Sequence, residues 1–355
     1  MKVALVTDQH FGARNDSVRV HDYFEKFYED VFFPYIDEHG IDTIIDLGDT
    51  FDRRKYISFN SLKRAKEMFF QKCQDRNLKL HVIVGNHDAY YKNTLEVNSV
   101  DLLLEEYDNI STYVEPEVIE VGGCEIMLVP WICEQNEEKT FVMADKTSAQ
   151  VLFGHLELAG YEMYKGGIID HGISDAWLKK FDLVCSGHYH HKSQNGCINY
   201  LGTAYEITWS DYNDQKGFHI FDTTTRELEF IENPHKLFHK VWYDDTDLDM
   251  AGLLKQCEQF EDFKGCSIKV IIKNKDNTML FDLYMEKLEA ADPMAIQVVT
   301  DHLHLDLEDD SDIIDEAEDT LTILDGYVEG LEIKNDKQDL QLLLRSLYDE
   351  ALSIS

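Results

Sequence analysis

The sequence predicts an α/β fold with more than one domain. Apolar runs typical of buried strands alternate with stretches of helical periodicity from Met1 to about Asp222. The chain has 355 residues, which exceeds the size at which a single hydrophobic core usually stops growing. Its apolar content of 44% is ordinary for a globular protein, and no apolar run reaches the roughly 18 residues that a membrane span requires. We therefore expect a layered protein without a membrane segment.

The first 230 residues supply most of the expected elements. Buried strands are expected at 3–6, 43–47, 80–84, 151–153 and 183–185, and helices at 24–39 and 61–77. Residues 118–121 and 125–130 flank Gly122-Gly123, a pattern that predicts a hairpin. Short strands are expected at 198–201, 217–221 and 228–231. This order of elements is typical of a layered α/β domain.

A smaller α/β unit and a tail are expected after this domain. The unit begins near residue 238 and should contain helix 249–260, strand 267–272, helix 278–290 and strand 295–299. Eight of the twelve residues from Glu308 to Asp319 are acidic and none is basic, which is typical of a solvated linker. Two amphipathic helices should follow this linker. The linker favours a detached module that binds another protein, although such helices also pack on their own domain.

The net charge and the cysteine content limit which substrates, partners and cellular compartments fit this chain. The formal net charge is −36, whereas a protein that grips a nucleic-acid backbone usually presents lysine and arginine. Either the substrate is small, or metal ions and a partner supply the missing positive charge. Seven cysteines without a C-x-x-C pair favour a reducing, cytoplasmic setting.

Five clusters of metal-binding residue types follow the expected strands. They are Asp8-Gln9-His10, Gly48-Asp49, Gly85-Asn86-His87-Asp88, Gly154-His155 and Gly187-His188-Tyr189-His190. We expect them to converge, because α/β proteins place their sites where the carboxyl ends of buried strands meet. Oxygen and nitrogen ligands without sulfur suit Mn²⁺, Fe²⁺ or Zn²⁺. The sequence therefore predicts a pocket for two divalent metal ions.

Two neighbouring metal ions need one shared ligand and separate ligands for each ion. Asp49 is the candidate bridge, because a carboxylate offers two oxygens and the preceding glycine allows a tight turn. The separate ligands are expected to be Asp8, His10 and His190 for one ion and Asn86, His155 and His188 for the other. A water bound by both ions becomes a hydroxide nucleophile near neutral pH. Phosphoester hydrolysis is the chemistry that this arrangement favours.

The residues in and near these clusters that are not predicted metal ligands are expected to act on the substrate. His87 is predicted to be the general acid that protonates the leaving alkoxide, and Asp88 is expected to accept its other ring N–H. Arg53, Arg54 and Asp52 follow the second cluster and are candidates for the substrate-phosphate site. Asp8-x-His10 alone is weak evidence, and a single Gly-His-x-His motif also occurs in surface loops, whereas Gly-Asn-His-Asp is more specific. Their order and strand-end placement together carry the prediction.

At these residues the pattern resembles the calcineurin-like metallophosphoesterase superfamily, whose motifs are D-x-H, G-D-x-x-D, G-N-H-[DE], G-H and G-H-x-H. The resemblance covers residues 1 to about 230 and implies a two-sheet sandwich flanked by helices, with a dinuclear site at one edge. Four stretches are further similar to the SbcD-type DNA repair nucleases, above all to their T-even phage branch: His81–Asn93, Val129–Glu134, Gly154–Gly166 and Tyr200–Thr203.

That resemblance also implies cofactors, partners and domains. It implies DNA as the substrate and two divalent ions, Mn²⁺ first, with Mg²⁺, Fe²⁺ or Zn²⁺ as alternatives. It further implies a homodimer formed through residues 56–70 and an SbcC-type, SMC-like ATPase bound by the C-terminal helices. The expected domains are a nuclease domain at 1–235, a DNA-facing accessory domain at 236–300, an acidic linker at 301–319 and ATPase-binding helices at 320–355. Archaeal and eukaryotic relatives have histidine at the position of Asp52, which leaves the endonuclease preference open.

Three functions are therefore weighed. The first is a nuclease subunit that degrades DNA from 3′ to 5′, with or without endonuclease activity, in the host cytoplasm if a phage encodes it. The second is a phosphatase or cyclic-nucleotide phosphodiesterase of the same superfamily, which the acidity favours. The third is a scaffold with a vestigial site, which the complete set of expected ligands argues against.

Overall fold

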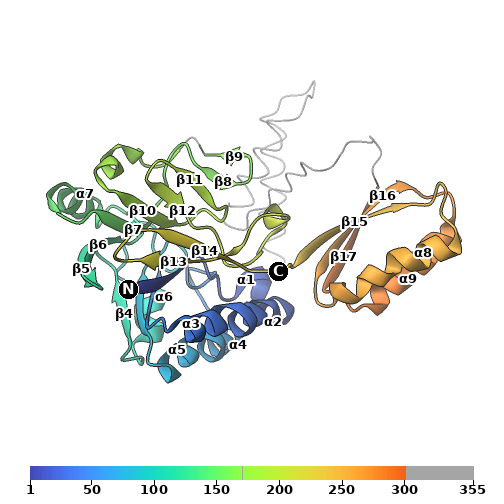
Figure 1. Ribbon diagram of the computed structural model, residues 1–355, viewed down its shortest axis with the longest axis horizontal. Coiled ribbons are helices and arrows are strands. Elements are labelled where there is room, and N and C mark those ends of the chain that lie inside the picture. Colours follow the sequence, from blue (N-terminus) through green and yellow to red (C-terminus); the bar gives the residue numbers. More distant parts are fainter. Residues whose placement is uncertain (170, 301–355) are drawn as a thin grey trace, which may run out of the picture. The chain divides into compact units, whose positions relative to one another are not determined.

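The computed structural model describes residues 1–169 and 171–300, so the expected linker and C-terminal helices lie outside the described residues. Two six-stranded sheets form a sandwich (Figure 1). The first consists, in spatial order, of β14 (Leu228–Glu232), β13 (Gly217–Asp222), β1 (Lys2–Val6), β2 (Thr43–Asp46), β3 (Lys79–Ile83) and β4 (Ile110–Tyr113). The second consists of β11 (Ser193–Asn195), β12 (Ile198–Tyr200), β10 (Leu183–Gly187), β7 (Val151–His155), β6 (Cys124–Val129) and β5 (Glu117–Val121). The predicted α/β sandwich is confirmed.

Parallel strands occupy the centre of both sheets. Strands β1 to β4 run parallel in the first sheet, as do β6, β7, β10 and β12 in the second. Antiparallel strands flank them, among them β5, which pairs with β6 in the predicted hairpin. Gly122 and Gly123 turn this hairpin with φ of 56° and 76°, angles that a type I′ turn requires and that glycine adopts without strain. The carboxyl ends of the parallel strands therefore lie together at one edge of each sheet.

An apolar layer joins the two sheets. Alternate residues of each strand point into it, for example Val3 and Leu5 of β1 and Val151 of β7, and all three are fully buried. The ring of Phe153 contacts that of Phe221 at 5.2 Å between centroids. Each large apolar side chain buried in this way contributes roughly 1.5–3 kcal/mol. The layer fixes the two sheet edges against each other, and the candidate site depends on that.

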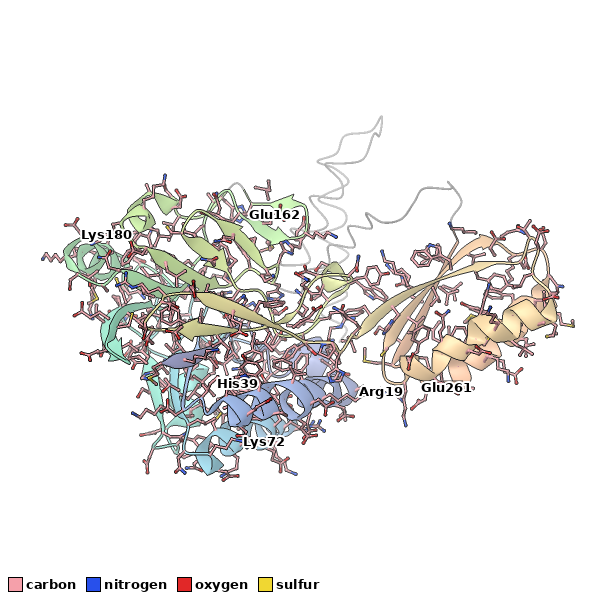
Figure 2. All side chains as sticks on the ribbon, viewed as in Figure 1. Arg19, His39, Lys72, Glu162, Lys180 and Glu261 are labelled. Atoms are coloured by element: carbon pink, nitrogen blue, oxygen red, sulfur yellow. The ribbon has the colours of Figure 1, made fainter. Side chains whose placement is uncertain are left out.

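Helices cover the outer face of the first sheet (Figure 1). The expected helix at 24–39 is observed as α2 (Val18–Phe27), the π-helical η1 (Tyr28–Phe32) and α3 (Phe33–His39), and the one at 61–77 as α4 (Phe59–Ala65), the π-helical η2 (Lys66–Phe70) and α5 (Gln71–Asp75). Aromatic side chains pack these helices together, with the rings of Phe32 and Phe69 6.0 Å apart. His39 and Lys72, both labelled in Figure 2, lie on this helical layer.

Several short elements were not expected from the sequence. They are the strands β4, β8 (Glu162–Tyr164), β9 (Gly167–Ile168) and β11, the helices α1 (Ala13–Asp16), α6 (Ser99–Leu104) and α7 (Glu137–Lys146), and the 3₁₀ turns η3 (Asp175–Lys180) and η4 (Trp209–Asp211). Residues of α7 and η3 pack on the outer face of the second sheet through Ala144 and Leu178. The second sheet is therefore also buried on both faces, which explains its apolar strands.

Residues 238–300 form the expected small α/β unit. Its parallel sheet has the order β15 (Phe238–Asp244), β16 (Ser267–Asn274) and β17 (Ala295–Thr300), connected by α8 (Met250–Cys257), the 3₁₀ turn η5 (Glu258–Phe263) and α9 (Thr278–Ala290). Side chains of Asp249 and Asn277 cap the two helices. The strand β15 was not expected, and the predicted helix at 249–260 becomes 3₁₀ after Cys257. Within the described part of the chain, no helix has the length and apolar character to cross a membrane.

Candidate metal centre

The predicted ligands gather at the carboxyl ends of parallel strands from both sheets. Asp8 follows β1, Asp49 follows β2 and Asn86 follows β3, while His155 ends β7 and His188 follows β10. These segments are far apart in the sequence, and the sandwich brings them together. Carboxylate oxygens and ring nitrogens of Asp8, His10 and His190 lie within 4.8 Å of one another, as do those of Asp49, His155 and His188. The two expected ligand groups are thus present as two clusters.

The first cluster is formed by Asp8, His10 and His190. The Nε2 atoms of His10 and His190 lie 3.1 Å apart, and Nε2 of His10 lies 4.0 Å from Oδ1 of Asp8. The Asp8 carboxylate is fixed by the backbone N–H of His188, at 3.1 Å from each oxygen. Two ring nitrogens that face each other and a carboxylate suit a shared cation.

The second cluster is formed by Asn86, His155 and His188. The Oδ1 atom of Asn86 lies 2.9 Å from Nε2 of His155 and 2.9 Å from Nδ1 of His188. The other nitrogen of His155, Nδ1, lies 2.8 Å from the carbonyl oxygen of Leu47 and must carry the proton, because a carbonyl only accepts. The Nε2 lone pair of His155 is therefore directed into the cluster, as a metal ligand requires.

The Asp49 carboxylate lies between the two clusters. Its Oδ2 atom is 3.3 Å from Nε2 of His155 and 4.0 Å from Nε2 of His10. Its Oδ1 atom accepts the backbone N–H of His87 at 2.7 Å. Asp49 is 2% exposed, so its oxygens meet protein groups rather than bulk water. This is the position that a bridging carboxylate would occupy.

At three of the motif glycines, any larger residue would collide with a neighbouring group. A Cβ atom on Gly48, which has φ of +98°, would lie 2.8 Å from Nδ1 of His155. One on Gly85 would collide with the carboxylate and amide of Asp49, and one on Gly187 with the Thr7 hydroxyl. The glycines of the motifs therefore allow the ligand loops to approach one another closely.

Four of the predicted ligand residues have left-handed backbone conformations. The φ angles are 50° for Asp8, 44° for His10, 55° for Asp49 and 84° for His188. Non-glycine residues rarely adopt such angles, which cost on the order of 1–3 kcal/mol each and are commonest at functional sites. The loops are thus held in conformations that the local sequence alone would not favour.

The surroundings of His87 correct one expectation. Its Nδ1 atom lies 2.5 Å from the carbonyl oxygen of Asp52, so the prediction that Asp88 accepts this ring N–H is wrong. Asp88 instead accepts the backbone N–H groups of Gly85 and Phe51, at 3.0 and 3.1 Å. The physical reason is that the buried carboxylate joins the loops after β2 and β3, whose amide groups would otherwise be unpaired. Nε2 of His87 remains available to a substrate.

The residues after Asp49 occupy different positions. Oδ1 of Asp52 lies 3.3 Å from Nδ1 of His10, where it can orient that ring. Arg53 hydrogen-bonds to Tyr56 and Asn15. Arg54 is half-buried, and burial lowers its pKa, a shift that the charge of Asp49 opposes only in part. The charge of Asp49 therefore acts on Arg54, which keeps Arg54 a candidate for the substrate-phosphate site.

Comparison with known proteins identifies the family. Residues 1–192 match the model of the calcineurin-like phosphoesterases. The chain is 32% identical to exonuclease subunit 1 of Enterobacteria phage T4, over 99% of both chains. It is 22% identical to a subunit of the nuclease SbcCD of Staphylococcus epidermidis, over 64% of this chain and 67% of the relative. It is also 24% identical to the DNA double-strand break repair protein Mre11 of Methanocaldococcus jannaschii, over 65% of each.

The chain belongs to the calcineurin-like phosphoesterase family. Membership implies divalent metal ions, and the donor atoms of this calcineurin-like phosphoesterase fit them. Among the residues that the structure describes, the first cluster offers carboxylate and imidazole donors, and the second, together with Asp49, offers carboxylate, amide and imidazole donors. Neither includes a thiol, and such a set suits divalent ions such as Mn²⁺, Fe²⁺ or Zn²⁺.

The electrostatics of the phosphoesterase site also favour cations. Burial alone would lower the pKa of His10, but the carboxylates of Asp52 and Asp49 raise it to about 9. Burial likewise opposes the charged form of His155, yet Asp49 raises its pKa to about 9. The pKa of Asp49 itself is lowered well below its usual value, because His155 and His87 outweigh its burial. Without metal ions, the rings of His10 and His155 therefore hold protons, which supply positive charge where the metal ions are expected to bind.

Sequence reasoning did not single out several residues that support or line the site. The ring of Trp131 lies 5.2 Å from that of His188, and it is half-buried. Gln9, between the predicted ligands Asp8 and His10, donates to the buried Asp46 at 2.6 Å, and its backbone carbonyl accepts the hydroxyl of Tyr205 at 2.6 Å. Gln9 lies within the first cluster and Trp131 within Val129–Glu134, but their contacts are with residues distant in sequence, so only the folded arrangement identifies those contacts.

Proposed function

We propose that this phosphoesterase is a DNA nuclease subunit that processes DNA ends in recombination and repair. The observation that carries the proposal is the 32% identity to the phage T4 exonuclease subunit over 99% of both chains, combined with both ligand clusters in place. The full-length match matters because it extends beyond the phosphoesterase motifs into residues 236–355. The two cellular relatives named above are a nuclease subunit and a DNA repair protein.

The proposed roles follow from the geometry. Asp8, His10 and His190 hold one ion and Asn86, His155 and His188 the other, with Asp49 between them. The two ions, Mn²⁺ in the proposal, supply a hydroxide nucleophile and neutralise phosphate charge when bound. His87 protonates the leaving oxygen from Nε2, since its Nδ1 donates to Asp52. Asp88 fixes the loops, and Arg54, which the charge of Asp49 influences, is the candidate to hold a phosphate oxygen.

The proposal also includes two protein partners, an ATPase and a second copy of the chain. We infer that DNA reaches this acidic chain with the help of an SMC-like ATPase that binds residues 320–355, and that two copies of the chain form a dimer. The net charge of −36 supports a role for the ATPase in holding DNA, because counterion release from a DNA backbone requires basic side chains. The accessory unit at 236–300 would then face DNA that the partner also holds.

The test is a nuclease assay on linear double-stranded DNA with Mn²⁺, Mg²⁺ or chelator. We expect shortening of the DNA with Mn²⁺ and none with chelator. Hydrolysis of a nitrophenyl phosphodiester without DNA cleavage, even after addition of the candidate ATPase, would refute the nuclease proposal. The acidic composition would then favour a phosphodiesterase that acts on small substrates.

A further inference from the structure

A buried lysine lies behind the loop that carries His188 and His190. Lys216, next to the start of β13, has no exposed surface. Its ammonium group donates to the carbonyl oxygen of His190 at 2.8 Å. It also contacts Oδ1 of Asp211 at 2.7 Å and Oδ2 of Asp214 at 3.0 Å. All three N–H donors of the ammonium group are therefore used.

The two carboxylates are themselves fixed. The other oxygen of Asp211 accepts the backbone N–H of Ile207 at 2.8 Å. Oδ1 of Asp214 lies 3.0 Å from Nδ1 of His191. An ion pair held by further hydrogen bonds at full burial has little freedom to move, because an uncompensated charge would be costly there. The cluster is thus a rigid support rather than a mobile surface pair.

This support acts on one metal ligand. The carbonyl of His190 receives Lys216 on one side and the backbone N–H of Thr203, at 3.1 Å, on the other. The Nε2 atom of its ring lies 3.1 Å from Nε2 of His10. His188 is anchored separately, through its own N–H to Asp8. The Lys216 cluster therefore holds the ligand of the first metal position and not that of the second.

We propose that Lys216 is a positioning residue that sets the place of His190 and, with it, the affinity of the Asp8–His10–His190 metal position. The inference rests on the proposed dinuclear site and adds to it a residue in no ligand motif. Groups that orient metal ligands typically contribute 10–100-fold to metal affinity. The chemical requirement is specific: a buried cation must reach one carbonyl while two carboxylates balance its charge.

The test compares Mn²⁺ binding by the wild-type chain and Lys216→Met, using calorimetry and electron paramagnetic resonance. We expect one of two ions to bind about 10–100-fold more weakly in the variant. At limiting Mn²⁺, the spin-coupled signal of a pair should give way to that of single ions. Lys180→Met is the control, because the Lys180 ammonium also donates to three carbonyls, including those of Asp145 at 3.2 Å and Thr147 at 3.1 Å. Lys180 lies on the surface at η3 (Figure 2).

The single variant leaves two buried carboxylates without their cation, so a second variant accompanies it. Lys216→Met with Asp211→Asn and Asp214→Asn removes the charges together and should show the same selective loss. Unchanged affinity for both ions in either folded variant would overturn the inference. Equal weakening of both positions would overturn it too, because a merely structural lysine would act so. A wild-type chain that binds no ion pair would instead refute the dinuclear site itself, and the inference with it.

Discussion

Replacement of His87 by alanine should separate proton transfer from metal binding. The backbone N–H of His87 holds Asp49 at 2.7 Å, and this bond survives the loss of the ring. Both ions should therefore still bind. A general acid contributes about 10²–10⁴-fold to turnover, which corresponds to about 2.7–5.4 kcal/mol in the barrier at 1.36 kcal/mol per tenfold change. We expect a loss of that size on DNA, whose leaving alkoxide needs a proton.

A second substrate sharpens the test of His87. The leaving group of a nitrophenyl phosphodiester is stable as an anion, so the variant should hydrolyse it with a much smaller loss than it shows on DNA. His39→Ala is the matched control, because His39 stacks on Tyr35 in the helical layer, away from the ligand clusters. His10, Asp52 and His87 also lie close enough to hold an ion. Loss of one bound ion in His87→Ala, or an equal loss on both substrates, would refute the role of general acid.

Three further predictions concern the metal positions. Asp49→Ala should lose both ions in a measurement of bound metal, because its carboxylate lies between the clusters; retention of two ions would show that it is no bridge. Gly187→Ala should weaken metal binding, since its Cβ would collide with Thr7 and lie 2.9 Å from Oδ2 of Asp8, whereas Gly252→Ala in α8 should bind metal normally. In chelator, the raised pKa values of His10 and His155, about 9, add stability that is complete below the unfolded value of about 6.5 and is lost as pH rises through 9. Thermal unfolding should show that loss, and Mn²⁺ affinity should rise over the same pH range as protons cease to compete.

The sequence was sufficient to predict the sandwich and the polar side chains that gather at its edge, because both depend on local signals. Apolar runs such as 151–153 marked buried strands, and each ligand motif followed one of them directly. The strand β15 was missed because half-buried and exposed polar residues, such as Lys240, interrupt its apolar pattern. The helices at 24–39 and 61–77 were recognised, but the first begins earlier, at Val18, and the second extends from Phe59 to Asp75. Their π-helical turns have no local sequence signal that we recognised.

Contacts between distant segments account for what the sequence did not predict. Asp88 adjoins His87, and adjacency suggested a hydrogen bond between them, yet the fold directs its carboxylate to the amides of Gly85 and Phe51. The carbonyl that takes its place belongs to Asp52, 35 residues away. Likewise Lys216 reaches His190 only because β13 packs beside the ligand loop. A motif specifies which side chains are available, whereas the packing of the sheets decides which atoms they meet.

The acidity of the site sets the order in which its ligands must bind. Asp8, Asp46, Asp49 and Asp88 are all at most 2% exposed, and burial with mutual repulsion raises the pKa of Asp46 to about 8. Without metal, the protonated rings of His10 and His155 only offset the carboxylates of this pocket, so an approaching phosphate would meet no net positive charge there. Two divalent ions bring four positive charges to the same place and make the pocket attractive to a phosphate. Metal loading must therefore precede phosphate binding, so affinity for a short DNA strand should depend on Mn²⁺ even in His87→Ala, which separates binding from turnover.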